Sequence, residues 1–135
     1  MTFAAIVVMV SVFSDTVFAA IMVTTEPENF DGTPVVGYLF VNDDNVTGTT
    51  VYSRSGSYLY LTVTVGAEYR YGGKDHYLSD YNYSNGGGTT ATVYLSLEEN
   101  PNAVFLKANG VHTVEYVFSG NIIYPSWTGI TEWKR

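Results

Sequence analysis

The chain has 135 residues, which is enough for one domain but not for two. Hydrophobic residues make up 46% and aromatic residues 16%, so a packed core is expected and a disordered chain is not. The formal net charge is −7 and no cluster of Lys or Arg is present, which argues against nucleic-acid binding and charge-driven docking on a membrane. The absence of cysteine excludes a disulfide framework and thiolate metal sites.

An almost unbroken apolar run occupies residues 3–13 (FAAIVVMVSVF). It is followed by the polar residues 14–16, and then by Val17 and Ala19, which are small enough for the −3 and −1 positions of a signal-peptidase site. We therefore expect residues 1–19 to be a signal peptide that is cut after Ala19. The mature protein is then secreted and extracellular.

Other interpretations of this segment stay open. An uncleaved anchor over residues 3–23 would be long enough to span a bilayer, although Asp15 near its middle would be costly, and it would be the chain's only membrane contact. The run also fits a buried strand or helix of the domain. Met1 and Thr2 supply none of the basic charge that usually precedes a signal sequence, which leaves open a start further upstream.

Residues 20–34 are expected to form a polar lead-in or linker, since residues 26–34 (EPENFDGTP) are polar and carry two prolines. Residues 35–135 are expected to form a single domain. Its first strand is predicted over residues 35–41 (VVGYLFV), and the Asn and Asp residues of 42–45 predict a turn.

Strict alternation of apolar and polar residues marks the next strands. It runs through residues 57–65 (SYLYLTVTV) until Gly66, and again through residues 89–97 (TTATVYLSL), which is typical of strands with one buried face. Between them, Gly72-Gly73 predicts a turn and residues 76–83 (HYLSDYNY) predict an edge strand.

Asn109-Gly110 is a strong signal for a two-residue hairpin, here between predicted strands at 103–108 and 111–118. The remaining tail holds Trp127 and Trp133. Short strands divided by turn residues favour an all-β fold, a small antiparallel β-sandwich or open barrel. The expected core comprises Leu59, Leu61, Val63, Val93, Leu95, Leu97, Val114 and Tyr116.

Groups able to carry catalysis or bind metal are few. His76 lies beside Asp75, but a second histidine at ligand spacing is missing, which favours a solvated loop. His112 and Glu115 are three residues apart on a predicted strand, so their side chains face opposite sides. No catalytic motif occurs, and we expect no enzymatic activity, no cofactor and no metal.

The many tyrosines on polar strand faces are the best indication of a binding surface. Exposed tyrosine rings offer rigid amphipathic area to sugars, peptides or lipid head groups. Ordinary cross-strand packing of Tyr and Thr is the competing explanation, because both residues favour strands. The candidate ligand-binding residues are Tyr58, Tyr60, Tyr81 and Tyr94.

One part of the chain resembles the lactococcin 972 family of secreted bacteriocins. Residues 79–84 (SDYNYS) lead through glycines into residues 90–93 (TATV), and residues 107–111 (KANGV) precede a strong strand, as in that family. The family's loop histidines are absent, and His112 replaces its tryptophan. The resemblance implies a compact β-sandwich without disulfides that kills related bacteria through a cell-wall precursor.

The sequence therefore favours a secreted, non-enzymatic binding or interaction domain that acts outside the cell or at a cell surface. The alternative is a bacteriocin-like antimicrobial protein acting on the cell wall of related bacteria, and a hydrolase with a site assembled in the fold comes third. The expected partner is a cell-surface glycan, a cell-wall precursor or a protein.

Overall fold

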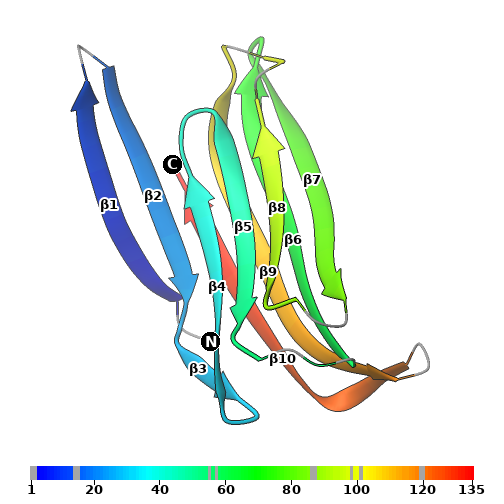
Figure 1. Ribbon diagram of the computed structural model, residues 1–135. Helices are drawn as coiled ribbons and strands as arrows, with labels where there is room; N and C mark the ends of the chain where they lie inside the picture. Colours follow the sequence, from blue (N-terminus) through cyan, green and yellow to red (C-terminus); the bar gives the residue numbers. More distant parts are fainter. Residues whose placement is uncertain are drawn as a thin grey trace.

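The computed structural model describes residues 3–13, 16–54, 56, 58–85, 88–97, 99–100, 102–118 and 121–135, and the side chains of residues 3–19, 85 and 123–125 lie outside this description. The described part of the chain contains ten strands and no helix, so no helix there is long and apolar enough to cross a membrane (Figure 1). The strands are β1 (Phe3–Phe13), β2 (Thr16–Thr25), β3 (Glu28–Phe30), β4 (Thr33–Val41), β5 (Asn45–Tyr52), β6 (Leu59–Tyr71), β7 (Lys74–Asn85), β8 (Thr90–Ser96), β9 (Val104–Phe118) and β10 (Asn121–Lys134).

The strands form two antiparallel sheets, which confirms the predicted all-β sandwich or open barrel. One sheet has the order β1-β2-β4-β5-β8, with β3 paired to β4, and the other has the order β10-β9-β6-β7. In Figure 1, β4, β5 and β8 lie in front of β6, β9 and β10. The expected edge strand is confirmed as β7, which pairs only with β6 among the described strands.

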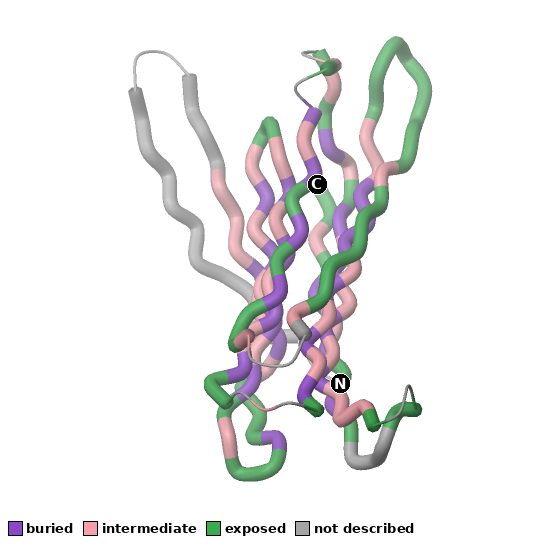
Figure 2. Tube along the Cα trace, turned by 45° about the vertical axis from the view of Figure 1, so that its right-hand side comes forward, coloured by how far each residue is buried: buried purple, intermediate pink, exposed green. Residues whose placement is uncertain are grey.

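The core lies between the two sheets, and buried residues alternate with partly buried ones along the central strands (Figure 2). Seven of the eight predicted core residues are buried. Tyr116 is only partly buried, because its hydroxyl reaches out of the core and donates a hydrogen bond to Asp31 (2.7 Å). That hydrogen bond raises the pKa of Tyr116, since the nearby carboxylate disfavours a second negative charge.

The predicted hairpin at Asn109-Gly110 is wrong. Both residues lie inside β9, where Asn109 pairs with Gly66 of β6 and Gly110 pairs with Thr131 of β10. Packing sets this outcome, because a Cβ atom at Gly110 would lie 2.6 Å from Thr131 Oγ1. The glycine makes room for its neighbours instead of turning the chain.

The predicted turn at Gly72-Gly73 is confirmed. It joins β6 to β7, and both glycines have positive φ (60° and 74°), as the primed turns of two-residue hairpins require. The turn at 42–45 is confirmed as well, since Asn42 Oδ1 accepts hydrogen bonds from the backbone amides of Asp44 (2.9 Å) and Asn45 (2.8 Å).

The segment 20–34, expected as an irregular lead-in, is built into the sheet instead. Its first residues continue β2, which pairs with β4, and Glu28–Phe30 forms β3. Thr25 is buried and accepts a hydrogen bond from the backbone amide of Gly37 (3.0 Å). The buried Phe30 ring packs against Tyr52 and Tyr116 and ties this polar segment to the core.

The predicted signal peptide, residues 1–19, covers β1 and the beginning of β2, which pair antiparallel. The side chains of these residues lie outside the described part, as do residues 1, 2, 14 and 15 altogether. Cleavage after Ala19 stays a prediction. Such a cut would leave in place the residues of β2 that pair with β4, Ile21 to Thr24.

Candidate functional site

A group of tyrosines gathers on the outer face of β6 and β7. Along β6 the odd-numbered residues from Leu59 to Val65 are buried, so the even-numbered ones point away from the core. Cross-strand partners share a face, which places Tyr83 beside Thr62, Tyr81 beside Thr64 and Tyr77 beside Glu68. We call Tyr60, Tyr77, Tyr81 and Tyr83 the tyrosine face.

Three rings of the tyrosine face form a chain of contacts. Tyr60 stacks on Tyr83 with ring centroids 6.3 Å apart, and Tyr83 meets Tyr81 at 6.0 Å. Tyr81 and Tyr83 remain about half exposed. Since these rings are held by their neighbours but not covered, they present a ready-made aromatic surface at low cost in side-chain entropy.

The Tyr77 hydroxyl occupies the space that a side chain at Gly66 would fill. Gly66 faces outward on β6, and an added Cβ atom there would collide with the Tyr77 hydroxyl and come within 2.9 Å of Asn109 Oδ1. The alternation of buried and exposed residues was expected to break at Gly66, and β6 itself continues through this glycine to Tyr71. The glycine's missing side chain is what lets the Tyr77 ring lie over the sheet.

Polar groups surround the rings. The hydroxyls of Thr62 and Thr113 are hydrogen-bonded to each other across β6 and β9, and Glu115 lies opposite Tyr60. Partial burial raises the pKa of Tyr81, and the negative charge of Glu115 adds to that rise. The Tyr81 hydroxyl therefore stays neutral at physiological pH and can donate a hydrogen bond.

The structure brings together only two of the four predicted site residues, Tyr58, Tyr60, Tyr81 and Tyr94. Tyr60 and Tyr81 share the tyrosine face through Tyr83, which sequence reasoning counted among the strand tyrosines but did not select. Tyr58, next to β6, packs edge-on against Phe118 (5.3 Å) at the end of the same sheet. Tyr94 belongs to β8 of the other sheet, opposite Thr47, and does not join them.

A second polar cluster lies in the core and is centred on His112, which is fully buried. Its Nδ1 lies 2.9 Å from Thr50 Oγ1, and its Nε2 lies 2.9 Å from Thr131 Oγ1. The ring fits because a Cβ atom at Gly37 or Gly110 would collide with it or crowd it. Sequence reasoning missed this cluster, although His112 falls on the same face of its strand as Val114.

The hydrogen bonds fix the tautomer of His112. Thr50 Oγ1 donates to the carbonyl of Thr62 (2.7 Å), so it accepts from Nδ1–H of His112. Burial lowers the pKa of His112 to about 4, so the ring is neutral and its Nε2 accepts from the Thr131 hydroxyl. Every polar atom of this ring is satisfied inside the protein, which suits a structural role better than proton transfer to a substrate.

His76 and its neighbours form no comparable site. His76 is exposed and stacks on Tyr69, with centroids 5.2 Å apart. Asp75 accepts hydrogen bonds from Arg70 (2.8 and 3.3 Å), which hold its pKa below the usual range. Within the described ranges no three His, Asp or Glu side chains are placed to hold a metal ion.

Comparisons with protein-family models, with curated proteins and with solved structures give no match for this chain. The resemblance to the lactococcin 972 family therefore stays a prediction. The candidate function has to be argued from the surface itself.

Proposed function

We propose that this protein is a secreted, non-enzymatic binding domain that recognises a cell-surface glycan through the tyrosine face. The observation that carries this proposal is the chain of ring contacts on one side of a sheet, which runs from the partly buried Tyr60 to Tyr83 and Tyr81, both about half exposed. Export rests on the predicted signal peptide over residues 1–19.

The chemistry of the face suits a saccharide. The C–H faces of a sugar ring pack on flat aromatic rings, and its hydroxyl groups bond to the neighbouring tyrosine and threonine hydroxyls and to the Glu115 carboxylate. A protein partner is usually met by a more continuous apolar centre. Here the rings alternate with polar groups such as Thr62 and Thr64, which favours the glycan.

Binding through rings and neutral hydroxyls should depend little on salt. The face carries the Glu115 carboxylate, and the whole chain is acidic, so charge attraction contributes nothing to a neutral ligand. Raising the salt concentration from 50 mM to 500 mM should leave the affinity within about twofold, because screening acts only on charge pairs.

The direct test is a screen of the secreted protein against neutral polysaccharides, peptidoglycan fragments and whole bacterial cells. Tyr60→Ala should weaken binding to the selected glycan about tenfold, since loss of a stacked aromatic costs roughly 1–2 kcal/mol. Full binding by this variant, or binding to proteins alone, would contradict the proposal. A growth-inhibition assay on the same cells tests the antimicrobial role implied by the family resemblance.

A further inference from the structure

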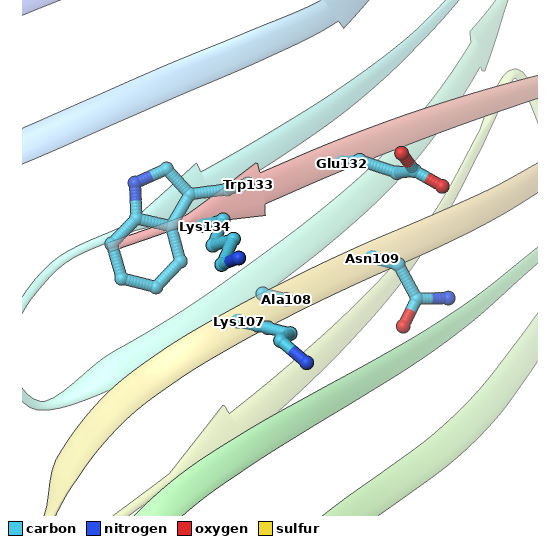
Figure 3. A pocket seen from close by; sticks show the side chains of 6 residues that line it. All are labelled: Lys107, Ala108, Asn109, Glu132, Trp133 and Lys134. Carbon is cyan, nitrogen blue, oxygen red and sulfur yellow. The ribbon is translucent and has the colours of Figure 1, made fainter.

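The two sheets of the protein differ in how they carry charge. The sequences of β1, β2, β4, β5 and β8 contain no Asp, Glu, Lys or Arg, so Glu28 of β3 is the one charged residue among the described strands of that sheet. Glu28 is engaged within the protein, because it accepts a hydrogen bond from Trp127 (2.8 Å). The other sheet has charged residues on every strand, and Figure 3 shows Lys107 of β9 with Glu132 and Lys134 of β10.

The sheet without these charges turns apolar side chains outward. The buried residues of β4 are the odd-numbered ones, so Val36, Tyr38 and Phe40 point away from the core. Cross-strand partners share a face, which places Val51 of β5 beside Val36 and Met22 of β2 beside Phe40. We call Met22, Val36, Tyr38, Phe40 and Val51 the apolar face.

No element of the described part of the chain covers the apolar face. In Figure 1, β4, β5 and β8 form the front layer, and no described strand lies before them. All residues of the apolar face remain partly exposed. A sheet face in contact with water normally carries polar side chains. An uncovered apolar face without charges is therefore typical of an interaction surface.

Charge and size favour a second copy of this chain as the partner. Each copy has a net charge of −7, so two copies repel each other least where neither surface is charged. The strands β2, β4, β5 and β8 are spaced about 4.8 Å apart and give an outer face of roughly 500 Å² on each copy. Two such faces bury about 1,000 Å² in all, which is the lower limit for a specific interface.

A lipid bilayer suits the apolar face less well than a second copy does. Thr47 and Thr49 of β5 lie among its side chains, opposite Phe40 and Tyr38. Hydroxyl groups that enter the hydrocarbon of a membrane lose their hydrogen bonds to water. Between two copies of the chain, the threonine and tyrosine hydroxyls can bond to one another or to water at the rim.

We propose that this protein forms a symmetric dimer through the apolar face. In a two-fold dimer the same patch meets itself, so one flat apolar surface serves both copies. The tyrosine face lies on the other sheet, and the two copies therefore present it on opposite outer sides of the dimer. The dimer does not depend on the proposed function, although it would let one assembly hold two glycan chains at once.

Sedimentation equilibrium of the secreted protein over a range of concentrations tests the proposal. We expect a reversible monomer–dimer equilibrium with a dissociation constant on the order of micromolar, as suits a small interface. Raising the salt concentration from about 50 mM to about 500 mM should tighten the dimer, because salt screens the repulsion between two acidic chains. A monomer at every concentration, or attachment to phosphatidylcholine vesicles in place of self-association, would overturn the proposal.

Charged variants locate the interface. Phe40→Glu and Thr47→Lys add a charge to the outward side of the sheet and leave the core untouched, since both side chains point away from it. Each should weaken the dimer about a hundredfold, because the two-fold axis brings like charges together. Circular dichroism checks that both variants remain folded. Dimers of native strength in both variants would contradict the proposed interface.

Ile130→Glu is the matched control. Ile130 is partly exposed, as Phe40 is, but it pairs with Val111 on the outer face of the other sheet. Its substitution by Glu should leave the dissociation constant of the dimer unchanged. Loss of the dimer in this variant, with the dimer of Phe40→Glu intact, would place the interface on the four-stranded sheet and overturn the proposal.

Discussion

His112 and Tyr83 belong to the same four-stranded sheet but lie on opposite sides of it. His112 is fully buried, and both ring nitrogens have hydroxyl partners within 3 Å. Tyr83 is about half exposed and is held only by neighbouring rings. A polar group in the core must be fully satisfied to be tolerated, whereas aromatic rings kept at the surface have no such structural requirement. The difference gives the His112 cluster a structural role and makes the tyrosine face the surface for which we propose recognition.

The largest effect is expected where the backbone makes room for His112. Gly110→Val would press a side chain against Thr131 Oγ1 and against His112 Nε2, which a Cβ atom alone would approach to 2.6 and 2.8 Å. We expect a loss of about 4 kcal/mol in the free energy of unfolding, at the high end for overpacking a core. Urea unfolding monitored by circular dichroism provides the measurement.

A matched glycine outside the core serves as the control. Gly72 has a positive φ of 60° and open space around its Cα, so Gly72→Ala should cost only about 1–2 kcal/mol of backbone strain. If Gly72→Ala proved as damaging as Gly110→Val, the packing around His112 would not be what distinguishes the two glycines.

Two residues on opposite faces of β8 extend the comparison to the other sheet. Leu95 is buried between the sheets, and Leu95→Ala should cost about 2–5 kcal/mol because it leaves a cavity. Thr92 is exposed and shares a hydroxyl hydrogen bond of 3.1 Å with Thr49, so Thr92→Ala should stay within roughly half a kcal/mol. Thermal unfolding of both variants checks the difference, and similar losses would mean that the two faces of β8 are misassigned.

The buried histidine predicts a specific dependence of stability on pH. The pKa of His112 falls from 6.5 to about 4 on folding, so between these values the unfolded chain binds a proton that the folded chain does not. Above pH 6.5 this group therefore has no effect on the free energy of unfolding. As the pH drops from 6.5 towards 4, the free energy of unfolding falls by about 3 kcal/mol in all.

His112→Gln is the control for this prediction, because glutamine retains a donor and an acceptor but does not titrate. Carboxylates titrate in both proteins, so the difference between the two stability curves isolates the histidine. The curves should diverge between pH 6.5 and 4 and run parallel above pH 6.5. Parallel curves over the whole range would show that His112 is not sealed in the core.

Alternation along β6 and β8 was enough to predict the buried and exposed faces of both strands. Side chains alternate between the two faces of a strand, so the burial of Leu61, Val63 and Leu95 fixes which face of each strand lies in the core. Glycine was a less reliable predictor of turns. Gly72-Gly73 forms the predicted turn in a place with open space around both glycines. Asn109-Gly110 forms no turn, because Gly110 is needed inside β9 to leave room for His112.

The candidate site was only partly predictable for a related reason. The period of two placed Tyr58 and Tyr60 on a polar face, but it does not reveal which strands become neighbours. Pairing of β6 with β7 brought Tyr81 and Tyr83 to Tyr60, whereas Tyr94 went to the other sheet. Long-range pairing is decided by packing across the whole fold, and no local pattern encodes it.

The central claim is that the tyrosine face recognises a ligand and is not needed for folding. Tyr83→Ala and Tyr94→Ala form a matched pair, because their rings are 51% and 54% exposed but lie on different sheets. The measurement is the affinity of each variant for the glycan selected by the native protein, together with its free energy of unfolding. We expect both variants to stay within about 1 kcal/mol of native stability, and only Tyr83→Ala to lose about tenfold in affinity. Equal affinities of the two variants, or a loss of affinity at Tyr83 that merely follows a loss of folding, would contradict the account.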